Sequence, residues 1–225
     1  MDPRVREAVR NNAEWCDLVC RAHGIATRFD PDAWIAIGRT PMFYPDAVTL
    51  APTPDDLLQR IDAGPGCSVK DSFAALDLGA VGFNLLFEAQ WIHRAAGAFA
   101  ATGAERVTSA AMLAAWAHAW GEAGAAGLFR PALLQAQDHA VIAAMRDGAI
   151  VGGCIATRSD GVLGISNLFA PAADDGSVRA ACLDAAMRFA PAVPLVAYEH
   201  GVSLAHMQQL GFHEIGALRI WQAPR

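Results

Sequence analysis

Apolar and polar positions form their clearest pattern in the C-terminal half, where two Asp-Gly pairs interrupt apolar, β-leaning runs. Asp147-Gly148 and Asp160-Gly161 each provide the positive φ angles that a two-residue hairpin turn requires. The pattern therefore predicts three consecutive antiparallel strands. These strands cover residues 139–146, 149–158 and 162–170.

Helical spacing replaces the strand pattern after this meander. Val178, Cys182 and Ala185 recur on one face of a predicted helix, and Ser177 is its expected N-cap. The complete predicted order is strand, strand, strand, helix, strand, helix, strand. The last four elements cover residues 177–190, 194–199, 203–210 and 213–222.

The N-terminal half shows the same strand and helix spacings of apolar residues, but less regularly. Pro54 suits the first position of a helix, and Pro45 would place its strand at a sheet edge because proline cannot donate to a ladder. Predicted helices cover 6–24, 54–64 and 73–80, and predicted strands cover 33–39, 43–50, 67–73 and 83–93. Between the halves, a strand near 104–109 and helices over 108–124 and 131–138 are expected.

Composition adds a large core and excludes two classes of partner. Of the 225 residues 54% are hydrophobic and 18% are charged, so a folded core is expected. The net charge of −6, without a basic stripe, argues against nucleic-acid binding. The apolar runs are too short to span a membrane, and the charged N-terminus does not resemble a signal peptide. We expect a soluble, cytoplasmic protein with a small-molecule partner.

The five cysteines have no regular spacing, which favours reduced thiols. Cys16, Cys20 and His23 could share one helix face, and this spacing is compatible with a metal ion. A buried cysteine is the simpler interpretation, because no second pair completes a zinc site. We therefore expect no metal, and a thiol or metal enzyme is the least favoured interpretation of this chain.

A short phrase occurs twice in the chain. "DLGAVGFNLLFEAQWI" (77–92) and "HMQQLGFHEIGALRIW" (206–221) each place a short helix before Gly-Phe and a long Trp-bearing strand after it. This repetition favours an internal duplication over coincidence. The predicted halves are 1–103 and 104–225.

The second half resembles the GCN5-related N-acetyltransferase (GNAT) family, in its order of elements and in the closing "HMQQLGFHEIGALRIWQ". The resemblance implies an α+β fold, in which helices flank a mixed, mostly antiparallel central sheet. The first half would be a shortened, diverged copy of the same acyl-CoA N-acyltransferase fold.

The resemblance also implies acetyl transfer from acetyl-CoA to a small-molecule amine. The pantetheine arm would lie where the third meander strand separates from the next strand, and the pyrophosphate would lie at the start of the following helix. The implied cofactor-binding residues are Leu168, Phe169, Ala170, Gly176, Ser177, Val178, Arg179 and Ala180.

The sequence departs from the family pattern in the phosphate loop and at the acid position. The phosphate loop reads Asp175, Val178 and Ala180, where the family has Arg or Gln, Gly, and Gly or Ala. Asp174 and Asp175 would repel a pyrophosphate, with Gly176, Ser177 and Arg179 as partial compensation. The position of the family's tyrosine acid corresponds to Met207, which has no proton to donate.

Candidate catalytic groups lie at the end of the strand over 194–199. Glu199 and His200 are candidates for the base, and Tyr198 could replace the missing acid. The alternative for Glu199 and His200 is a solvated strand end, and His206 is expected on the surface.

A non-catalytic binding module on the same scaffold is the main alternative function, because fold alone does not fix function. Lys70-Asp71-Ser72 does not form a triad, because neighbouring residues of a strand point to opposite faces. We expect a strand end here, with Asp71 or Ser72 capping the next helix. The sequence leaves open whether the chain forms a homodimer.

Overall fold

The computed structural model describes residues 2–122, 126–174 and 176–224, which form two compact units. The first unit comprises Met1–Ile92, Tyr198–Leu204 and Glu214–Arg225. The second comprises His93–Ala197 and Ala205–His213. The C-terminal strand lies in the first unit because it pairs with a strand of the N-terminal half, Trp221 with Val69.

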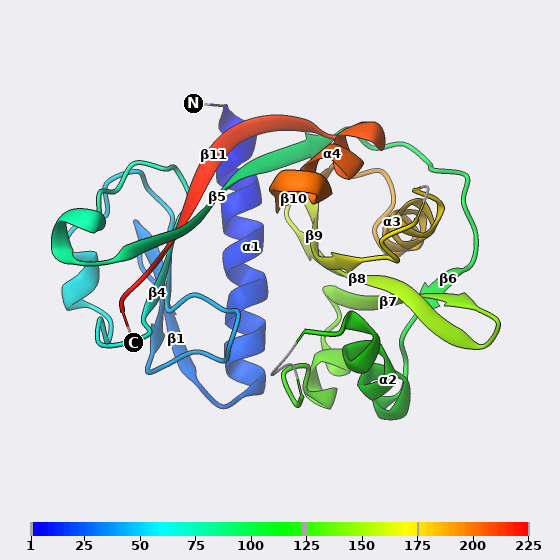
Figure 1. The fold of residues 1–225 in the computed structure, drawn as a ribbon, viewed down its shortest axis with the longest axis horizontal. Coiled ribbons are helices and arrows are strands. Elements are labelled where there is room, and N and C mark those ends of the chain that lie inside the picture. Colours follow the sequence, from blue (N-terminus) through cyan, green and yellow to red (C-terminus); the bar gives the residue numbers. More distant parts are fainter. Residues whose placement is uncertain (1, 123–125, 175, 225) are drawn as a thin grey trace. The chain divides into compact units, whose positions relative to one another are not determined.

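The first unit contains one long helix and strands in the order β1-β2-β3-β4-β11-β5 (Figure 1). Strand β3 runs parallel to β4, whereas the β1–β2, β2–β3 and β4–β11 pairs are antiparallel. Its elements are α1 (Pro3–Ala22), β1 (Ala26–Phe29), β2 (Ala33–Ile37), β3 (Ala47–Thr49), β4 (Ser68–Asp71), β5 (Asn84–Arg94) and β11 (His213–Gln222), with short 3₁₀ turns at Leu57–Gln59 and Gly79–Val81.

The two faces of this sheet bury different groups, as strand alternation requires. Ile35 and Val69 face an apolar cluster that also contains Trp221. On the other face, the Trp34 indole donates a hydrogen bond to Asp17 of α1 at 3.2 Å. Helix α1 therefore covers the side of the sheet that carries the polar contacts.

The second unit has strands in the order β10-β9-β8-β7-β6 (Figure 1). The pairs β6–β7, β7–β8 and β8–β9 are antiparallel, and β9–β10 is parallel. The predicted fold class, a mixed and mostly antiparallel sheet flanked by helices, is confirmed. The elements are β6 (Ala104–Arg106), α2 (Ala110–Trp120), β7 (His139–Arg146), β8 (Ala149–Ser159), β9 (Val162–Phe169), α3 (Ser177–Phe189), β10 (Leu195–Glu199) and α4 (Gly201–Gln209).

Two adjacent glycines on β8 allow helices to approach the sheet from opposite faces (Figure 1). A Cβ on Gly152 would lie 2.3 Å from Val178 of α3. A Cβ on Gly153 would lie 2.1 Å from the indole nitrogen of Trp116 in α2, which donates to Ile142 O at 2.7 Å. These contacts fix α2 and α3 on the two sides of the meander.

The repeated phrase folds into the same turn in both places. The glycines before Phe83 and Phe212 have φ angles of 90° and 87°. The Phe83 amide donates to Leu78 O at 3.0 Å, and the Phe212 amide donates to Met207 O at 3.1 Å. This six-to-one bond and the left-handed glycine are features of the Schellman motif, which ends a helix. The shared local geometry is consistent with the predicted duplication.

Three predictions for the first half are wrong. The helix expected over 54–64 is only a 3₁₀ turn, because Asp56 is left-handed (φ 44°) and Arg60 is held by Asp32 at 2.8 Å. The helix expected over 73–80 is likewise reduced to Gly79–Val81. Strand β3 is not an edge strand, since β2 and β4 flank it. Pro45 precedes β3 and therefore leaves its ladder intact.

Two further predictions differ in detail. The helix expected over 131–138 is a 3₁₀ segment, Pro131–Gln135. Strand β1 was not predicted, because its half-exposed residues give no apolar run. Elsewhere the hairpins agree with expectation, and Asp147 and Gly148 both have positive φ angles, 51° and 78°.

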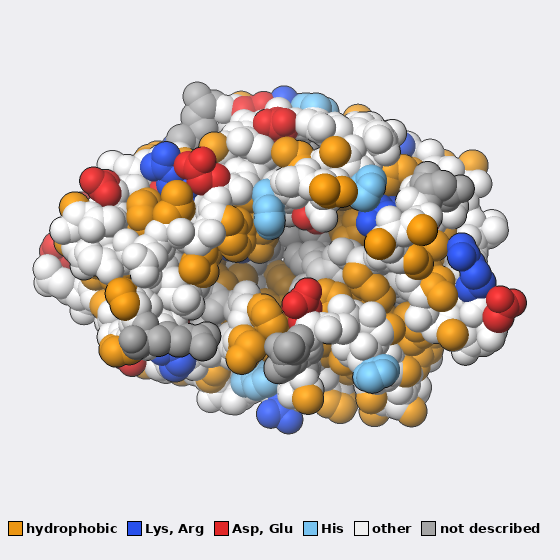
Figure 2. Space-filling model, viewed as in Figure 1, with side chains coloured by type: hydrophobic (Ala, Val, Ile, Leu, Met, Phe, Trp, Pro, Cys, Tyr) orange, Lys and Arg blue, Asp and Glu red, His pale blue; other side chains and the backbone are white. Residues whose placement is uncertain are grey.

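The surface carries scattered charge. Figure 2 shows basic side chains separated from one another on the face in view, with no continuous basic patch there. Among the residues that the structure describes, no helix combines the length and apolarity needed to cross a membrane.

Candidate functional site

Strands β9 and β10 pair over only a short distance. Leu163 pairs with Leu195 and Gly164 with Val196, and no later pair of these strands occurs in the described chain. Strand β9 nevertheless continues to Phe169. Its second half therefore leaves peptide groups on the β10 side without a strand partner, which is the separation that the family resemblance implied.

A β-bulge lies in the same part of β9. Ile155 of β8 pairs with Ser166, and Gly153 pairs with Phe169, so one residue of β8 faces two residues of β9. The extra residues are Asn167, which has a φ of 53°, and Leu168. A bulge leaves the extra residue outside the ladder and re-aims the backbone. Leu168 thus lies in the bulge.

Phe169 and Ala170 follow the bulge, and their surroundings differ. The half-buried Phe169 ring packs edge-on against the buried Trp116 ring, with centroids 5.3 Å apart. Ala170 is half-buried just beyond β9.

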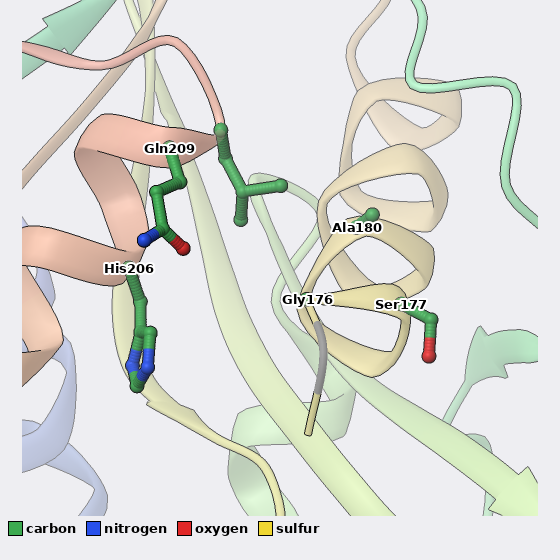
Figure 3. A pocket seen from close by; sticks show the side chains of 6 residues that line it. Gly176, Ser177, Ala180, His206 and Gln209 are labelled. Atoms are coloured by element: carbon green, nitrogen blue, oxygen red, sulfur yellow. The ribbon is translucent and has the colours of Figure 1, made fainter. Parts of the chain in front are cut away.

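A cavity of about 320 Å³ lies between the first turn of α3 and helix α4 (Figure 3). Figure 3 shows His206 and Gln209 extending from the same side of α4, whereas the Ser177 hydroxyl points away from α4. The sequence indicated three of its residues and missed the other three, because the α4 side of the wall has no local signal. The lining residues are Gly176, Ser177, Ala180, His206, Gln209 and Leu210.

The start of α3 is already occupied by a carboxylate of the same chain. Asp174 accepts hydrogen bonds from the amides of Val178 (3.1 Å) and Arg179 (3.4 Å). It also forms an ion pair with the Arg179 guanidinium at 2.9 Å, and its side chain is 1% exposed. The expected Ser177 N-cap is wrong, because the N-cap position is Gly176 and makes no side-chain bond. Asp175 lies outside the described residues.

Val178 and Arg179 do not face the cavity. Val178 is buried and packs onto Gly152 of β8, so its side chain fills the interface between helix and sheet. Arg179 is engaged with Asp174 and is not available as a free cation. Of the predicted phosphate-loop residues, only Gly176, Ser177 and Ala180 line the cavity.

The three candidate catalytic residues lie in the first unit. The Tyr198 ring is half-buried, with the Lys70 ammonium 4.1 Å from its centroid and the Trp91 ring 5.4 Å away. Glu199 is half-buried, and the exposed His200 stacks on Phe87 at 4.8 Å. The assignment of Glu199 and His200 as a base stays a prediction.

No protein-family model and no curated protein matches this sequence. Solved structures match nearly the whole chain. A GCN5-related N-acetyltransferase from Kribbella flavida aligns with a TM-score of 0.68 at 16% identity, covering 100% of this chain and 97% of that one. The chain has the GCN5-related N-acetyltransferase fold.

Two further solved structures align over a similar extent. A functionally unknown conserved protein from Staphylococcus epidermidis aligns with a TM-score of 0.64 at 11% identity, over 88% of this chain and 93% of that one. A protein from Novosphingobium aromaticivorans assigned to the GNAT family aligns with a TM-score of 0.56 at 11% identity, over 94% and 96% of the two chains. At these identities the comparisons establish the fold.

The acid position of the GNAT pattern is buried as well as apolar. Met207 is 1% exposed and forms part of the turn that ends α4. A methionine thioether has no ionisable proton. Any proton donor must therefore come from another residue.

Sequence reasoning treated Lys70 as the end of a strand and missed its burial. It is the only lysine in the chain and is 2% exposed. Its ammonium donates to Asn12 Oδ1 at 2.6 Å, and no described carboxylate forms an ion pair with it. A lone lysine inside a strand of a chain otherwise supplied with arginine was the available signal. Neighbouring Asp71 accepts from the Leu76 amide at 2.9 Å, so it caps the turn after β4 and not the helix that was expected there.

The thiol and metal interpretation finds no support in the geometry. Burial raises the pKa of the Cys16 thiol, and it raises the pKa of Cys20 to about 12, which disfavours a reactive thiolate. His23 is the C-cap of α1. Within the described ranges, no group of three or more His, Cys, Asp or Glu side chains is placed to hold a metal ion.

Proposed function

We propose that this chain transfers an acetyl group from acetyl-CoA to a small-molecule amine. The observation that carries the proposal is the separation of β9 from β10 after two residue pairs. Peptide groups of Leu168, Phe169 and Ala170 would pair with the amides of the pantetheine arm, as an added strand pairs with a sheet edge. The cavity between α3 and α4 would receive the rest of the arm.

The proposed reaction needs few specialised groups. The amine lone pair attacks the thioester carbonyl carbon and forms the C–N bond. The C–S bond then breaks, and its electron pair leaves with sulfur. One amine proton is removed and sulfur receives one proton, so the products are an amide and free CoA thiol. Positioning of the two reactants would supply much of the rate, and backbone N–H groups near the bulge would stabilise the oxyanion.

Three residues are proposed to move the protons. Glu199 or His200 would take the proton from the amine, and Tyr198 would return one to the sulfur. Support for Tyr198 comes from its ordered surroundings between Lys70 and Trp91, since a held side chain is better placed than a free one.

A non-catalytic binding module is the second candidate. Two observations favour it: Asp174 occupies the start of α3, and Met207 replaces the acid. In this case the cavity between α3 and α4 would hold a ligand, but no thiol would be released.

Ligand binding and turnover separate the two candidates. At a hundredfold excess over the dissociation constant, acetyl-CoA should raise the melting temperature by about 5 °C or more. Release of CoA thiol across a panel of primary amines would then establish transfer. A thermal shift without thiol release would support the binding module, and the absence of both would contradict the proposal.

A pair of tryptophan substitutions tests the place of binding. Ala180→Trp fills the cavity from α3 and should abolish the thermal shift. Ala205→Trp adds the same bulk at an exposed position of α4 that does not line the cavity, and it should preserve the shift. Equal loss in both variants would place the ligand elsewhere.

A further inference from the structure

The position of Asp174 at the start of α3 bears on which part of the acyl donor this site recognises. The inference rests on the proposed acyl transfer. The first turn of a helix attracts anions through its N–H groups and its dipole. In α3 the Asp174 carboxylate accepts from two of these groups, the amides of Val178 and Arg179. A diphosphate in the same place would have to displace a buried carboxylate.

The cation in the first turn of α3, Arg179, is also already paired. The Arg179 guanidinium is bound to Asp174 at 2.9 Å, and the two side chains are 12% and 1% exposed. A phosphate brought to this turn would meet the negative charge of Asp174 without a free positive charge from Arg179. The electrostatic preference of the helix start is therefore already satisfied within the chain.

The cavity beside this turn is suited to a neutral, amide-bearing ligand. None of its six lining residues is lysine or arginine. Gln209 provides an amide that can donate and accept, and Leu210 and Ala180 provide apolar contact. The buried Nδ1 atom of His206 has no hydrogen-bond partner in the described structure, so it is available for a ligand group.

We propose that the site recognises the acyl donor through its pantetheine arm, and that the nucleotide diphosphate contributes little to binding. The donor class is a pantetheinyl acyl thioester. Acetyl-CoA is one member of this class, and S-acetylpantetheine, which carries no phosphate, is another.

The direct test compares three probes on the intact wild-type chain by calorimetry. The dissociation constants of acetyl-CoA and S-acetylpantetheine should agree within about threefold, because both carry the pantetheine arm. This ratio corresponds to a difference in binding free energy of about 0.7 kcal/mol. 3′-Phosphoadenosine 5′-diphosphate, which is the nucleotide diphosphate of CoA without the pantetheine arm, should not compete. Binding of acetyl-CoA that is thirtyfold tighter, or competition by the nucleotide, would overturn the inference.

Removal of one charge provides the second test. Asp174→Asn keeps an oxygen acceptor for the two amides but releases Arg179, so acetyl-CoA should bind about tenfold more tightly than to the wild type. Binding of S-acetylpantetheine should not change. The matched control is Asp138→Asn, which removes the same charge from an exposed ion pair with Arg158 of the same unit and should alter neither. An unchanged acetyl-CoA affinity in Asp174→Asn would contradict the role of this carboxylate.

Arg146 is the cation that could hold a phosphate by another route. It lines a separate cavity of about 190 Å³ together with Ser177 and Val178. If the inference is correct, Arg146→Gln leaves the ratio of the two thioester affinities unchanged. A selective loss of acetyl-CoA binding would show that the nucleotide is recognised there.

These outcomes separate the inference from the proposed function. Equal, measurable binding of both thioesters supports the inference, and release of CoA thiol with an amine then decides the proposed function. Strong preference for acetyl-CoA removes the inference and leaves the proposed function standing. If neither thioester binds at millimolar concentration, both are wrong.

Discussion

At the scale of single residues, Lys70 is the most unusual group in the first unit. Its buried ammonium donates to the side-chain amide oxygen of Asn12 and lies over the ring face of Tyr198. No carboxylate in the described part of the chain forms an ion pair with it. Burying a charge is unfavourable unless polar partners replace the lost water. The Asn12 bond is therefore expected to contribute much more to stability than a surface contact.

A double-mutant cycle tests this expectation. Asn12→Leu leaves the ammonium buried without its acceptor and should lower the free energy of unfolding by about 3–5 kcal/mol. Adding Lys70→Met removes the charge and should restore most of the loss. Urea unfolding measures both. A cost below about 1 kcal/mol for Asn12→Leu, or additive effects, would show that the ammonium is solvated.

At the scale of elements, the glycine pair of β8 positions both helices of the second unit. Gly152 allows the close approach of Val178, and Gly153 allows the close approach of Trp116. A Cβ at either position would overlap atoms of the opposite element. The two positions differ in the side chain that must move: Val178 for Gly152, where the Phe169 backbone oxygen would also lie at 2.9 Å, and Trp116 for Gly153, where the Ile142 backbone oxygen would lie at 2.6 Å.

This difference predicts unequal rescue. Gly152→Ala and Gly153→Ala should each destabilise the chain by about 1–3 kcal/mol or more through overpacking. Val178→Ala should recover part of the loss in Gly152→Ala, because it removes the atom at 2.3 Å. Val178→Ala should not improve Gly153→Ala, which makes that pair the matched control. Thermal unfolding of the four variants provides the comparison, and equal rescue would contradict the packing described.

Local chemistry explains why some elements could be predicted from sequence. The β7–β8 and β8–β9 hairpins follow from Asp147-Gly148 and Asp160-Gly161, whose turn preference is intrinsic. The expected helix over 54–64 fails because long-range contacts decide it, above all the ion pair between Arg60 and Asp32. Propensity does not report such a contact between distant parts of the chain.

The candidate site shows the same limit. Gly176, Ser177 and Ala180 were found because one loop contains them, whereas His206 and Gln209 come from α4, later in the chain. Asp174 was recognised as a repelling charge, but its capping of α3 depends on the fold of the loop. Only the coordinates show that the charge is buried and paired.

At the scale of the whole molecule, the chain consists of two units, and each unit is built from stretches that are not continuous in the sequence. The last strand, β11, lies between β4 and β5 in the first unit. The matched turns at Phe83 and Phe212 support the duplication of 1–103 and 104–225, which stays a hypothesis. Because β11 completes the first sheet, neither half of the sequence corresponds to a closed structural unit.

The central claim is that a pantetheinyl thioester binds along β9 where it leaves β10. Hydrogen exchange with and without saturating acetyl-CoA, read by mass spectrometry, tests it most directly. The account predicts slower exchange in residues 164–170 and in the first turn of α3, because ligand amides would cover the separated edge. Unchanged exchange there, or protection confined to other parts of the chain, would contradict it.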